Sequence, residues 1–157
     1  MFILIFYMLM TLTLNDWQQF MIDDVKGYFD KTEYKNVSVT ITALSILETG
    51  WYKAPVHDEF HNYFSIKEFN VKKRHPLCKK KPIYCMREYK TNEAGYKDAL
   101  EYFKRLKYPT DRKGFLDRLN GTGGAKYADD KDHVQKVKDV EWMVKNKYLK
   151  GKYISVP

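Results

Sequence analysis

The stretch "SILETGWYKAPVHDEFHNYFSIK", Ser45 to Lys67, decides which fold the sequence predicts. It closes an apolar helical run with one glutamate, Glu48, and continues with Gly50 and Trp51. Because helices commonly end at a glycine, we expect a helix that stops at Gly50 with Glu48 in its last turn. The negative end of that helix and the apolar neighbours of Glu48 both favour the neutral acid form of the carboxyl. A neutral acid suits general acid catalysis; the alternative is an exposed helix-end residue.

Apolar residues at helical spacing predict helices on both sides of this stretch. Asn15 and Asp16 are candidate N-caps for the first helix, and Ser38 is a candidate N-cap for the second. In the first helix the expected inward stripe is Trp17, Phe20, Met21, Val25 and Phe29. The predicted helices cover residues 15–29, 38–48, 92–108, 111–121 and 130–149.

The segment between these helices, residues 51–89, shows no long helical period and is punctuated by three prolines. "FSIKEFNVKK" (64–73) alternates weakly and "PIYCMREY" (82–89) is similar, so both are interpreted as short strands of a small hairpin. The sequence therefore predicts an α+β fold that is mainly helical, with a short β-hairpin or irregular insert in the middle.

The charge of the chain favours an anionic partner. The formal net charge is +8 and the pI is about 9.3, which favours nucleic acid, anionic lipid or an acidic wall polymer without choosing among them. The run "KKRHPLCKKKP", Lys72 to Pro82, contains no acidic residue, although a solvated loop would also look like this. No stacking-aromatic pattern or helix-turn-helix signature accompanies the run, so nucleic acid is the least favoured partner.

The chain has two cysteines, Cys78 and Cys85, which flank "KKKPIY". Two cysteines are too few for a zinc site without histidines, and the spacing to His75 matches no metal motif, so no metal and no cofactor are expected. The pair would staple the insert in an oxidising compartment, or it would remain as two free thiols. The sequence leaves both alternatives open.

The chain starts with an apolar segment, "MFILIFYMLMTLTL" (1–14). Its apolar run of about thirteen residues is shorter than the ~20 residues of a spanning helix. It also lacks the basic start and the cleavage site of a secretory signal. We interpret it as a buried or partner-docked segment, with an uncleaved membrane-targeting segment as the alternative. The remaining residues, 15–157, form a single domain in this interpretation, as the total of 157 residues suggests.

"ALSILETGW" (43–51) resembles the "A-A-L-E-S/T-G-W" segment of glycoside hydrolase family 73, bacterial and phage N-acetylglucosaminidases that cut peptidoglycan. "NYFSIK" (62–67) is similar to the family's "N-L-F-G-I-K", and "MREYKTNEAGYKDAL" (86–100) to its "F-R-x-Y-x-S-x-x-E-S-x-x-D". "AKYADDKDHVQKV" (125–137) is similar to its closing "G-Y-A-T-D-P-x-Y-x-x-K". The four segments occur in the family's order and cover roughly residues 17–148. The resemblance implies a lysozyme-like glycosidase domain, related to goose-type lysozymes and lytic transglycosylases.

The resemblance also implies roles for individual residues. Glu48 matches the general acid, and Tyr127 matches a tyrosine that faces the acid across the groove. The Tyr127 hydroxyl would hydrogen-bond the N-acetyl group of the sugar or position a water. Ser65 replaces the family's glycine in the turn. The substrate-binding residues implied in this way are Trp51, Asn62, Tyr63, Phe64 and Ser65.

The family's hairpin carries a second acidic residue, but here the insert is short and basic. Candidates for a second acid are Glu68 at the start of the insert and Asp58 and Glu59 in the loop after Glu48. Three routes stay open: inversion with a displaced base, assistance by the acetamide of the substrate, or a transglycosylase route with Glu48 alone. A glucosaminidase, a muramidase and a lytic transglycosylase are therefore all compatible with the sequence.

The resemblance sets the expected partners and location. The enzyme would bind the peptidoglycan glycan strand in the cell wall or periplasm, with the basic run attracting anionic wall polymers. Because the chain shows no wall-binding repeats, we expect a phage lysin or a virion-associated phage lysin, whose residues 1–14 dock on other virion proteins. The alternative is a structural or adaptor domain of a phage virion with weak or no activity, which the missing hairpin acid supports.

Overall fold

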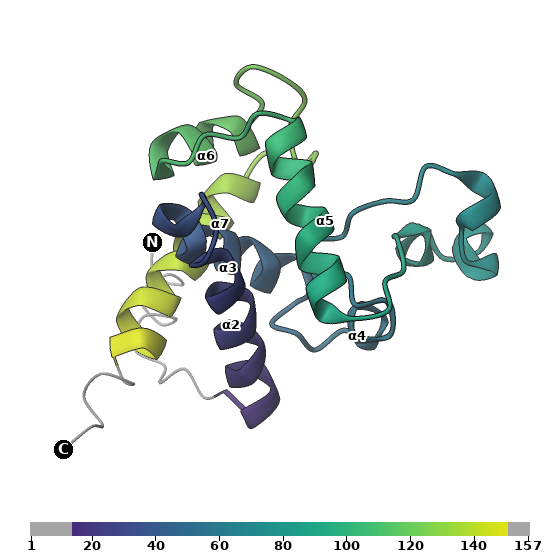
Figure 1. Ribbon diagram of the computed structural model, residues 1–157, viewed down its shortest axis with the longest axis horizontal. Helices are drawn as coiled ribbons and strands as arrows, with labels where there is room; N and C mark the ends of the chain where they lie inside the picture. The colour runs from purple at the N-terminus through teal and green to yellow at the C-terminus, as the bar shows by residue number, and fades with distance from the viewer. Residues whose placement is uncertain (1–13, 151–157) are drawn as a thin grey trace.

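The computed structural model describes residues 14–150 as a helical body from which one segment projects. Figure 1 shows α2 (Asp16–Phe29), α3 (Ser38–Glu48), α6 (Arg112–Leu119) and α7 (His133–Met143) gathered on one side of α5 (Asn92–Arg105). The short helix α4 (Pro55–Phe60) and the chain that follows it extend on the other side. The predicted N-terminal segment, apart from Leu14, lies outside the described residues.

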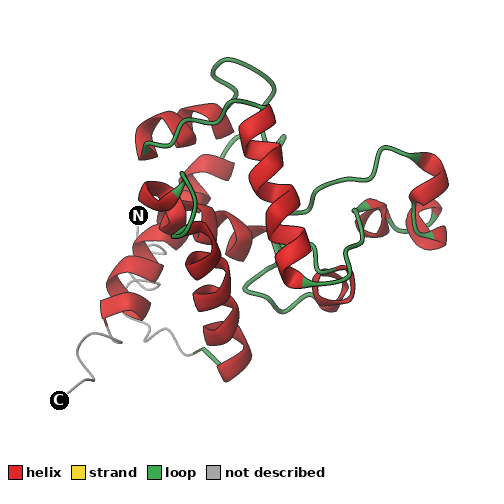
Figure 2. Cartoon of the chain, in the orientation of Figure 1, coloured by secondary structure: helices red, strands yellow, loops and turns green. Residues whose placement is uncertain are grey.

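The predicted mainly helical fold is confirmed, and the insert takes its irregular form (Figure 2). Between residues 14 and 150, no helix combines the length and the apolar character needed to cross a membrane. The remaining helical elements are the 3₁₀ turns Lys35–Val37, Val71–Lys73, Pro76–Lys79 and Pro82–Cys85 and the π-helical turn Val144–Leu149.

The strands predicted over 64–73 and 82–89 are wrong, because the described residues there pair only at one antiparallel bridge between Lys67 and Met86. Side chains bind the backbone locally instead: Asn70 Oδ1 accepts from the Lys72 N–H, and His75 Nδ1 accepts from the Leu77 N–H. Such local bonds compete with strand pairing and form turns. Prolines 76 and 82 then begin two of the 3₁₀ turns, where a missing N–H costs nothing.

Helix α2 is where the sequence predicts it, but its inward stripe differs from the predicted one. Asn15 caps the helix together with Gln18 in a capping box. Trp17 and Phe20 are 40% and 52% exposed, so their predicted place in the core is wrong. The buried stripe consists of Gln18, Met21, Ile22, Val25 and Phe29. Gln18 occupies an inward position because its Nε2 donates to the Trp51 carbonyl at 2.8 Å, a contact that no local pattern reveals.

Helix α3 is the centre of the body. Nearly all of its side chains are buried, although many are β-branched, so packing and not helix propensity holds it. It packs against α2 and α7. Its start also differs from the prediction: Ser38 is the first helical residue and not the cap, and its hydroxyl donates to Asp30 at 2.5 Å.

An aromatic cluster joins α5 to the surrounding elements. The Phe103 ring lies at its centre, with neighbours from α2, α6 and the turn after α4. The rings in contact with Phe103 are Phe29, Tyr34, Phe64, Tyr102, Tyr108 and Phe115. Edge and tilted contacts of this kind add to the free energy gained by burial alone.

The projecting segment, residues 68–85, is called the basic arm below. It leaves and rejoins the body beside the Lys67–Met86 bridge, where the Glu68 N–H donates to the Cys85 carbonyl at 2.8 Å. A disulfide joins Cys78 to Cys85, which is one of the two alternatives that the sequence leaves open. Tyr84 and His75 pack their rings against Phe60 of α4, so the arm has a small apolar contact of its own with the body.

Candidate active site

The end of α3 presents Glu48 in the predicted position. The Trp51 N–H donates to the Ile46 carbonyl at 2.9 Å, and the Gly50 N–H donates to the Leu47 carbonyl at 3.3 Å. These two bonds form a Schellman motif, with Gly50 at φ +58° in the left-handed region that the motif requires. Glu48 is therefore the last residue of α3, with its backbone fixed by the turn that follows.

The left-handed conformation continues into Trp51 and Tyr52, at φ +63° and +57°. Bulky residues seldom adopt this conformation, and each costs on the order of 1–3 kcal/mol. Gln18 holds the turn through the Trp51 carbonyl, and the Thr49 hydroxyl accepts from the Tyr52 N–H at 3.0 Å. The segment "TGWY" therefore forms the backbone turn that directly follows Glu48, and the Trp51 side chain in this turn is half-buried.

Glu48 contacts a histidine from the other end of the chain. Its Oε1 lies 3.0 Å from Nε2 of His133, and the two side chains are 16% and 7% exposed respectively. Near the other ends of the same helices, the Thr40 hydroxyl donates to Glu141 at 2.8 Å, so α3 and α7 run antiparallel. Because His133 is the first residue of α7, the Glu48 carboxyl lies between the negative end of α3 and the positive end of α7.

The other ring nitrogen of His133 identifies its tautomer. Nδ1 is buried and has no hydrogen-bond partner among residues 14–150. A hydrogen on Nδ1 would be a buried, unpaired donor, which costs about 1–3 kcal/mol. The favoured form therefore carries its hydrogen on Nε2 and donates it to Glu48 Oε1.

Tyr127 completes the group. Its ring stacks on the His133 ring, with centroids 5.7 Å apart and planes 19° apart. Its hydroxyl donates to the Phe64 carbonyl at 2.5 Å. Burial, and next the negative charge of Glu48, raise the pKa of Tyr127 well above its ordinary value, so the phenol stays neutral. The structure thus brings the two predicted catalytic residues into contact with His133, Tyr127 on the face of the ring and Glu48 at its Nε2 edge.

The loop that delivers Tyr127 is shaped around a buried arginine. Nη1 of Arg118 donates to the Ala125 carbonyl at 2.7 Å, and the Tyr127 N–H donates to the Leu119 carbonyl at 3.0 Å. Gly124 lies so close to Arg118 that a Cβ at this position would be 2.6 Å from Nη2. Of the glycines in "GTGG", Gly124 therefore serves this close approach, while Gly121 and Gly123 adopt positive φ angles of +101° and +77°.

The turn predicted to line the sugar groove is largely buried: Asn62, Tyr63 and Phe64 are 1%, 1% and 2% exposed. The Asn62 amide clamps the base of the basic arm, because Nδ2 donates to the carbonyls of Ile66 and Arg87, both at 2.9 Å. Oδ1 of Asn62 accepts from the Ile66 N–H at 3.1 Å.

Two members of the turn have other surroundings. The Tyr63 hydroxyl lies 3.1 Å from Asp58 Oδ1 and 3.0 Å from Asn92 Oδ1, so it ties α4 to α5. Ser65 is half-buried at φ +53°, a conformation that explains why the family pattern has glycine here. The buried members of the turn thus shape the loop, and the Phe64 carbonyl holds Tyr127.

The chain matches a known protein family over most of its length. A family model named Glucosaminidase, described as mannosyl-glycoprotein endo-beta-N-acetylglucosaminidase, matches residues 30–146. The chain belongs to the glucosaminidase family. The matched range starts after α2 and includes Glu48, Tyr127 and His133, and the helical body agrees with the lysozyme-like domain expected of a glucosaminidase. The protein is a glycoside hydrolase that acts on peptidoglycan. Comparisons with curated proteins and with solved structures find no match.

His133 is the residue of this candidate site that sequence reasoning missed. In the segment "AKYADDKDHVQKV" it stands where the family pattern "G-Y-A-T-D-P-x-Y-x-x-K" has its second tyrosine. A histidine in place of a tyrosine, six residues after Tyr127, was the available signal. Its contact with Glu48, 85 residues away in sequence, is tertiary and has no local pattern.

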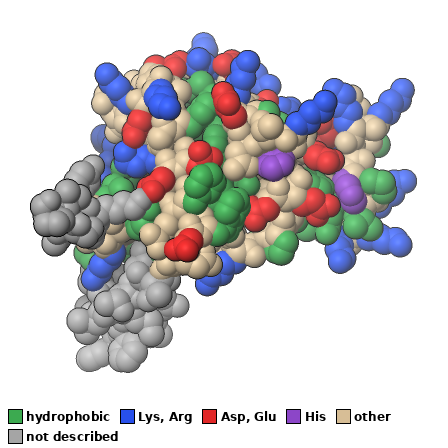
Figure 3. All heavy atoms as spheres, turned by 60° about the horizontal axis from the view of Figure 1, so that its bottom comes forward, with side chains coloured by type: hydrophobic (Ala, Val, Ile, Leu, Met, Phe, Trp, Pro, Cys, Tyr) green, Lys and Arg blue, Asp and Glu red, His purple; other side chains and the backbone are tan. Residues whose placement is uncertain are grey.

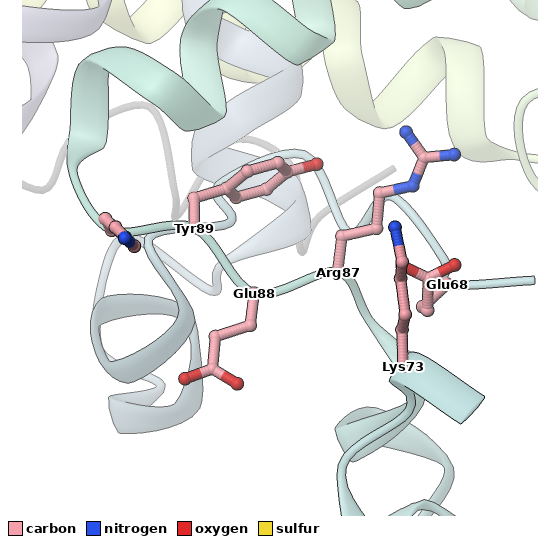
Figure 4. Close-up of a pocket in the computed structure, with 6 residues that line it drawn as sticks. Glu68, Lys73, Arg87, Glu88 and Tyr89 are labelled. Atoms are coloured by element: carbon pink, nitrogen blue, oxygen red, sulfur yellow. The ribbon is translucent and has the colours of Figure 1, made fainter. Parts of the chain in front are cut away.

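The three candidates for a second acid lie in different places. Glu68 lines an open hollow of about 630 Å³ at the base of the arm, and its Oε1 accepts from the Asn70 N–H. Figure 4 shows Glu68, Lys73 and Arg87 on one side of this hollow, while Glu88 points away from Arg87. Asp58 is partly buried in α4; burial raises its pKa despite the hydrogen bond from Tyr63. Glu59 is exposed on the same helix.

None of these three carboxylates is hydrogen-bonded to Glu48 or His133 in the part of the chain that the structure describes. The described residues also contain no group of three or more His, Cys, Asp or Glu placed to hold a metal ion. In the segment 86–100, which resembles the family pattern "F-R-x-Y-x-S-x-x-E-S-x-x-D", the arginine, the tyrosine and the aspartate meet. Arg87 pairs with Asp98 at 2.8 Å, and the Tyr89 hydroxyl donates to the same carboxylate at 2.6 Å. These contacts attach the segment that follows the arm to helix α5.

Proposed function

We propose that this glucosaminidase cleaves the peptidoglycan glycan strand on the reducing side of N-acetylglucosamine, with Glu48 as general acid. The observation that carries this proposal is the Glu48–His133 pair at the partly exposed end of α3. It supports an acid role because one carboxyl oxygen has a fixed partner within the protein while the side chain still reaches solvent.

The two oxygens of Glu48 then have different tasks. His133 donates from Nε2 to Oε1, which fixes the carboxyl and leaves Oε2 to carry the acidic proton. Oε2 gives this proton to the glycosidic oxygen as the bond to the anomeric carbon breaks. Negative charge then develops on the carboxyl. The Nε2–H of His133 and the positive end of α7 stabilise that charge without moving.

Tyr127 supports this arrangement in two ways. Its ring stacks on His133 and limits rotation of the imidazole. Its hydroxyl uses its hydrogen for the Phe64 carbonyl but keeps lone pairs free to accept a hydrogen bond. The N–H of the substrate acetamide is the donor that we assign to it, in agreement with the predicted contact with the N-acetyl group.

The group that acts on the anomeric carbon is the second part of the proposal. Glu68 is engaged with Asn70 and Asp58 with Tyr63, while Glu59 is exposed on α4. This placement favours the two routes that need only one protein carboxylate: attack by the substrate acetamide, or the transglycosylase route. In both, Glu48 donates a proton in the first step and accepts one in the second.

A clearing assay on purified peptidoglycan tests the role of Glu48. Glu48→Gln keeps the shape and the hydrogen bond from His133 but removes the acidic proton, so we expect its clearing rate to fall to background. Glu101→Gln, an exposed glutamate on α5, is the matched control and should clear like wild type. Equal clearing by wild type and Glu48→Gln would refute the assignment.

Mass spectrometry of the released fragments tests the bond and the route. A reducing-end N-acetylglucosamine would support the glucosaminidase assignment, and a reducing-end N-acetylmuramic acid would point to a muramidase. An anhydro product would identify the transglycosylase route.

No clearing by wild type on walls from suitable hosts would favour the second candidate function, a structural or adaptor domain of a phage virion. This second candidate function is supported by the absence, in the insert, of the acidic residue that the family carries in its hairpin. A phage lysin or virion-associated setting for the active enzyme, with residues 1–14 docking on virion proteins, stays a prediction. The docking segment lies almost wholly outside the described residues.

A further inference from the structure

The basic arm concentrates charge that is not neutralised. Residues 68–85 carry six lysine or arginine side chains and one acid, Glu68. On the described part of the chain, none of the six forms an ion pair with a carboxylate, whereas on the body several lysines and arginines do. Arg74 donates only to the Glu68 backbone carbonyl. The six are Lys72, Lys73, Arg74, Lys79, Lys80 and Lys81.

The arm also exposes apolar side chains among these cations. Phe69 and Val71 are 75% and 68% exposed, and Leu77 and Ile83 are 38% and 43% exposed. These are four of the seven large apolar side chains that are exposed between residues 14 and 150, gathered in one short segment. Figure 3 shows Lys and Arg side chains fringing the projecting end of the molecule, with apolar side chains between them. Such a mixture marks an interaction surface.

The exposure is built into the arm and does not result from a loose chain. The Cys78–Cys85 disulfide closes a loop over the second half of the arm, the 3₁₀ turns order its backbone, and its ring contacts with Phe60 hold it to α4. Figure 1 shows the arm standing clear of the helical body, so a flat surface can reach it without meeting α2, α3 or α7.

We propose that the basic arm is a docking surface for an anionic lipid bilayer. Lysines near such a surface are attracted to anionic headgroups, and apolar side chains between them enter the interfacial region. The apolar residues decide between lipid and an anionic polymer. A chain of phosphates would be held by the lysines alone and would gain nothing from an exposed Phe69 or Val71. Docking would hold the catalytic body on the membrane face next to its peptidoglycan substrate.

Co-sedimentation with vesicles tests the proposal on the full chain. The vesicles are phosphatidylcholine alone, or phosphatidylcholine with three parts in ten phosphatidylglycerol. Wild type should bind the anionic vesicles and not the neutral ones. The charge variant K72Q/K79Q/K80Q/K81Q should lose binding by about fivefold per lysine removed. The apolar variant F69S/V71S/L77S/I83S should bind at least tenfold more weakly and should lose its remaining binding at a lower salt concentration than wild type.

Matched changes on the body serve as controls. K31Q/K35Q/K97Q/K138Q removes the same charge from exposed positions on the body, and W17S/F20S/W142S removes its exposed apolar side chains. Both should bind anionic vesicles far better than the corresponding arm variants. Circular dichroism and an intact disulfide confirm that each variant is folded, and peptidoglycan clearing, which does not depend on lipid, is measured separately.

Three outcomes would overturn the proposal. The first is that wild type does not bind anionic vesicles, and the second is that both arm variants bind like wild type. The third is that the apolar variant binds like wild type while soluble inorganic polyphosphate competes with the vesicles. That last result would identify the arm as a site for anionic polymers.

Discussion

The candidate catalytic corner and the basic arm use charge in opposite ways. At the corner, where the end of α3 meets the start of α7, Glu48 is paired with a buried histidine. Near the other ends of the same two helices, Glu141 accepts from Thr40, Arg112 and Lys145. In the arm, cations are exposed and unpaired with carboxylates in the described structure. Buried pairs fix geometry because leaving either partner buried without the other would cost free energy. Exposed charges instead act at a distance, and salt weakens their interactions. The corner is therefore suited to chemistry and the arm to attraction.

Glu48→Gln should produce the largest effect, and it acts only on the corner. General acid catalysis contributes about 10²–10⁴-fold, so peptidoglycan cleavage should slow by at least that factor. Thermal stability should change little, because the amide fits the same space. Fragment release measured by chromatography, with differential scanning calorimetry on the same sample, checks both statements. A large fall in melting temperature would mean that lost activity reports unfolding.

Removing the disulfide should produce the next largest effect, and it acts only on the arm. In the chain-entropy treatment, a loop of this length is stabilised by about 2.5 kcal/mol. Because the arm meets the body over a small contact, C78S/C85S should loosen residues 68–85 and leave the helical body intact. Limited trypsin digestion should then cut after the arm lysines faster than in wild type, with little change in peptidoglycan cleavage. Uniformly faster digestion of the body would show that the two regions are not separate.

Replacing His133 tests whether the corner is held by its hydrogen bond. His133→Phe keeps a flat ring against Tyr127 but removes the donor to Glu48, so kcat should fall about tenfold with KM nearly unchanged. His133→Gln keeps an N–H near the position of Nε2 and should restore much of the lost rate. Steady-state kinetics on a soluble glycan fragment checks this. Equal kcat values for His133→Phe and His133→Gln would show that the hydrogen bond to Glu48 does not determine the rate.

Glu141 should give the smallest effect, visible as a change in acid stability. Burial alone would raise the pKa of Glu141, but hydrogen bonds from Arg112, Thr40 and Lys145 hold it below the ordinary 4.5. A depressed folded-state pKa contributes stability above the unfolded value and loses it as the pH falls through the folded value. The free energy of unfolding of wild type should therefore decrease on acidification from about pH 4.5 downward. The free energy of unfolding of Glu141→Gln, measured by urea unfolding at each pH, should decrease less steeply with falling pH. Parallel slopes would contradict this.

Local sequence signals predicted the parts of the structure that are locally determined. Gly50 marked the end of α3 because a left-handed residue must follow the helix, and Asn15 marked the start of α2 because its side chain caps the next turn. The strand prediction failed where Asn70 and His75 bind backbone N–H groups two residues away. Weak alternation could not show that these short bonds would prevail.

The remaining features of the site depend on contacts between distant segments. The sequence around Glu48 shows only the negative end of its own helix, while the positive end of α7 and the imidazole of His133 come from 85 residues later. The polar side chain of Gln18 gives no sign of an inward position, yet it holds the turn that follows Glu48 through the Trp51 carbonyl. Asn62 was expected at the sugar, but its amide is used within the protein.

The clamp formed by Asn62 has a consequence for how this molecule can be rebuilt. The chain departs at Lys67 and returns at Met86, two residues that face each other across one bridge, and Asn62 binds the backbone on both sides of that bridge. The arm between Lys67 and Met86 leaves the helical body and returns to it at the same place. We therefore expect that the arm can be shortened to a tight turn, lengthened or exchanged for another module without changing the register of the body. The proposed membrane docking and the proposed catalysis could then be altered separately in one short chain.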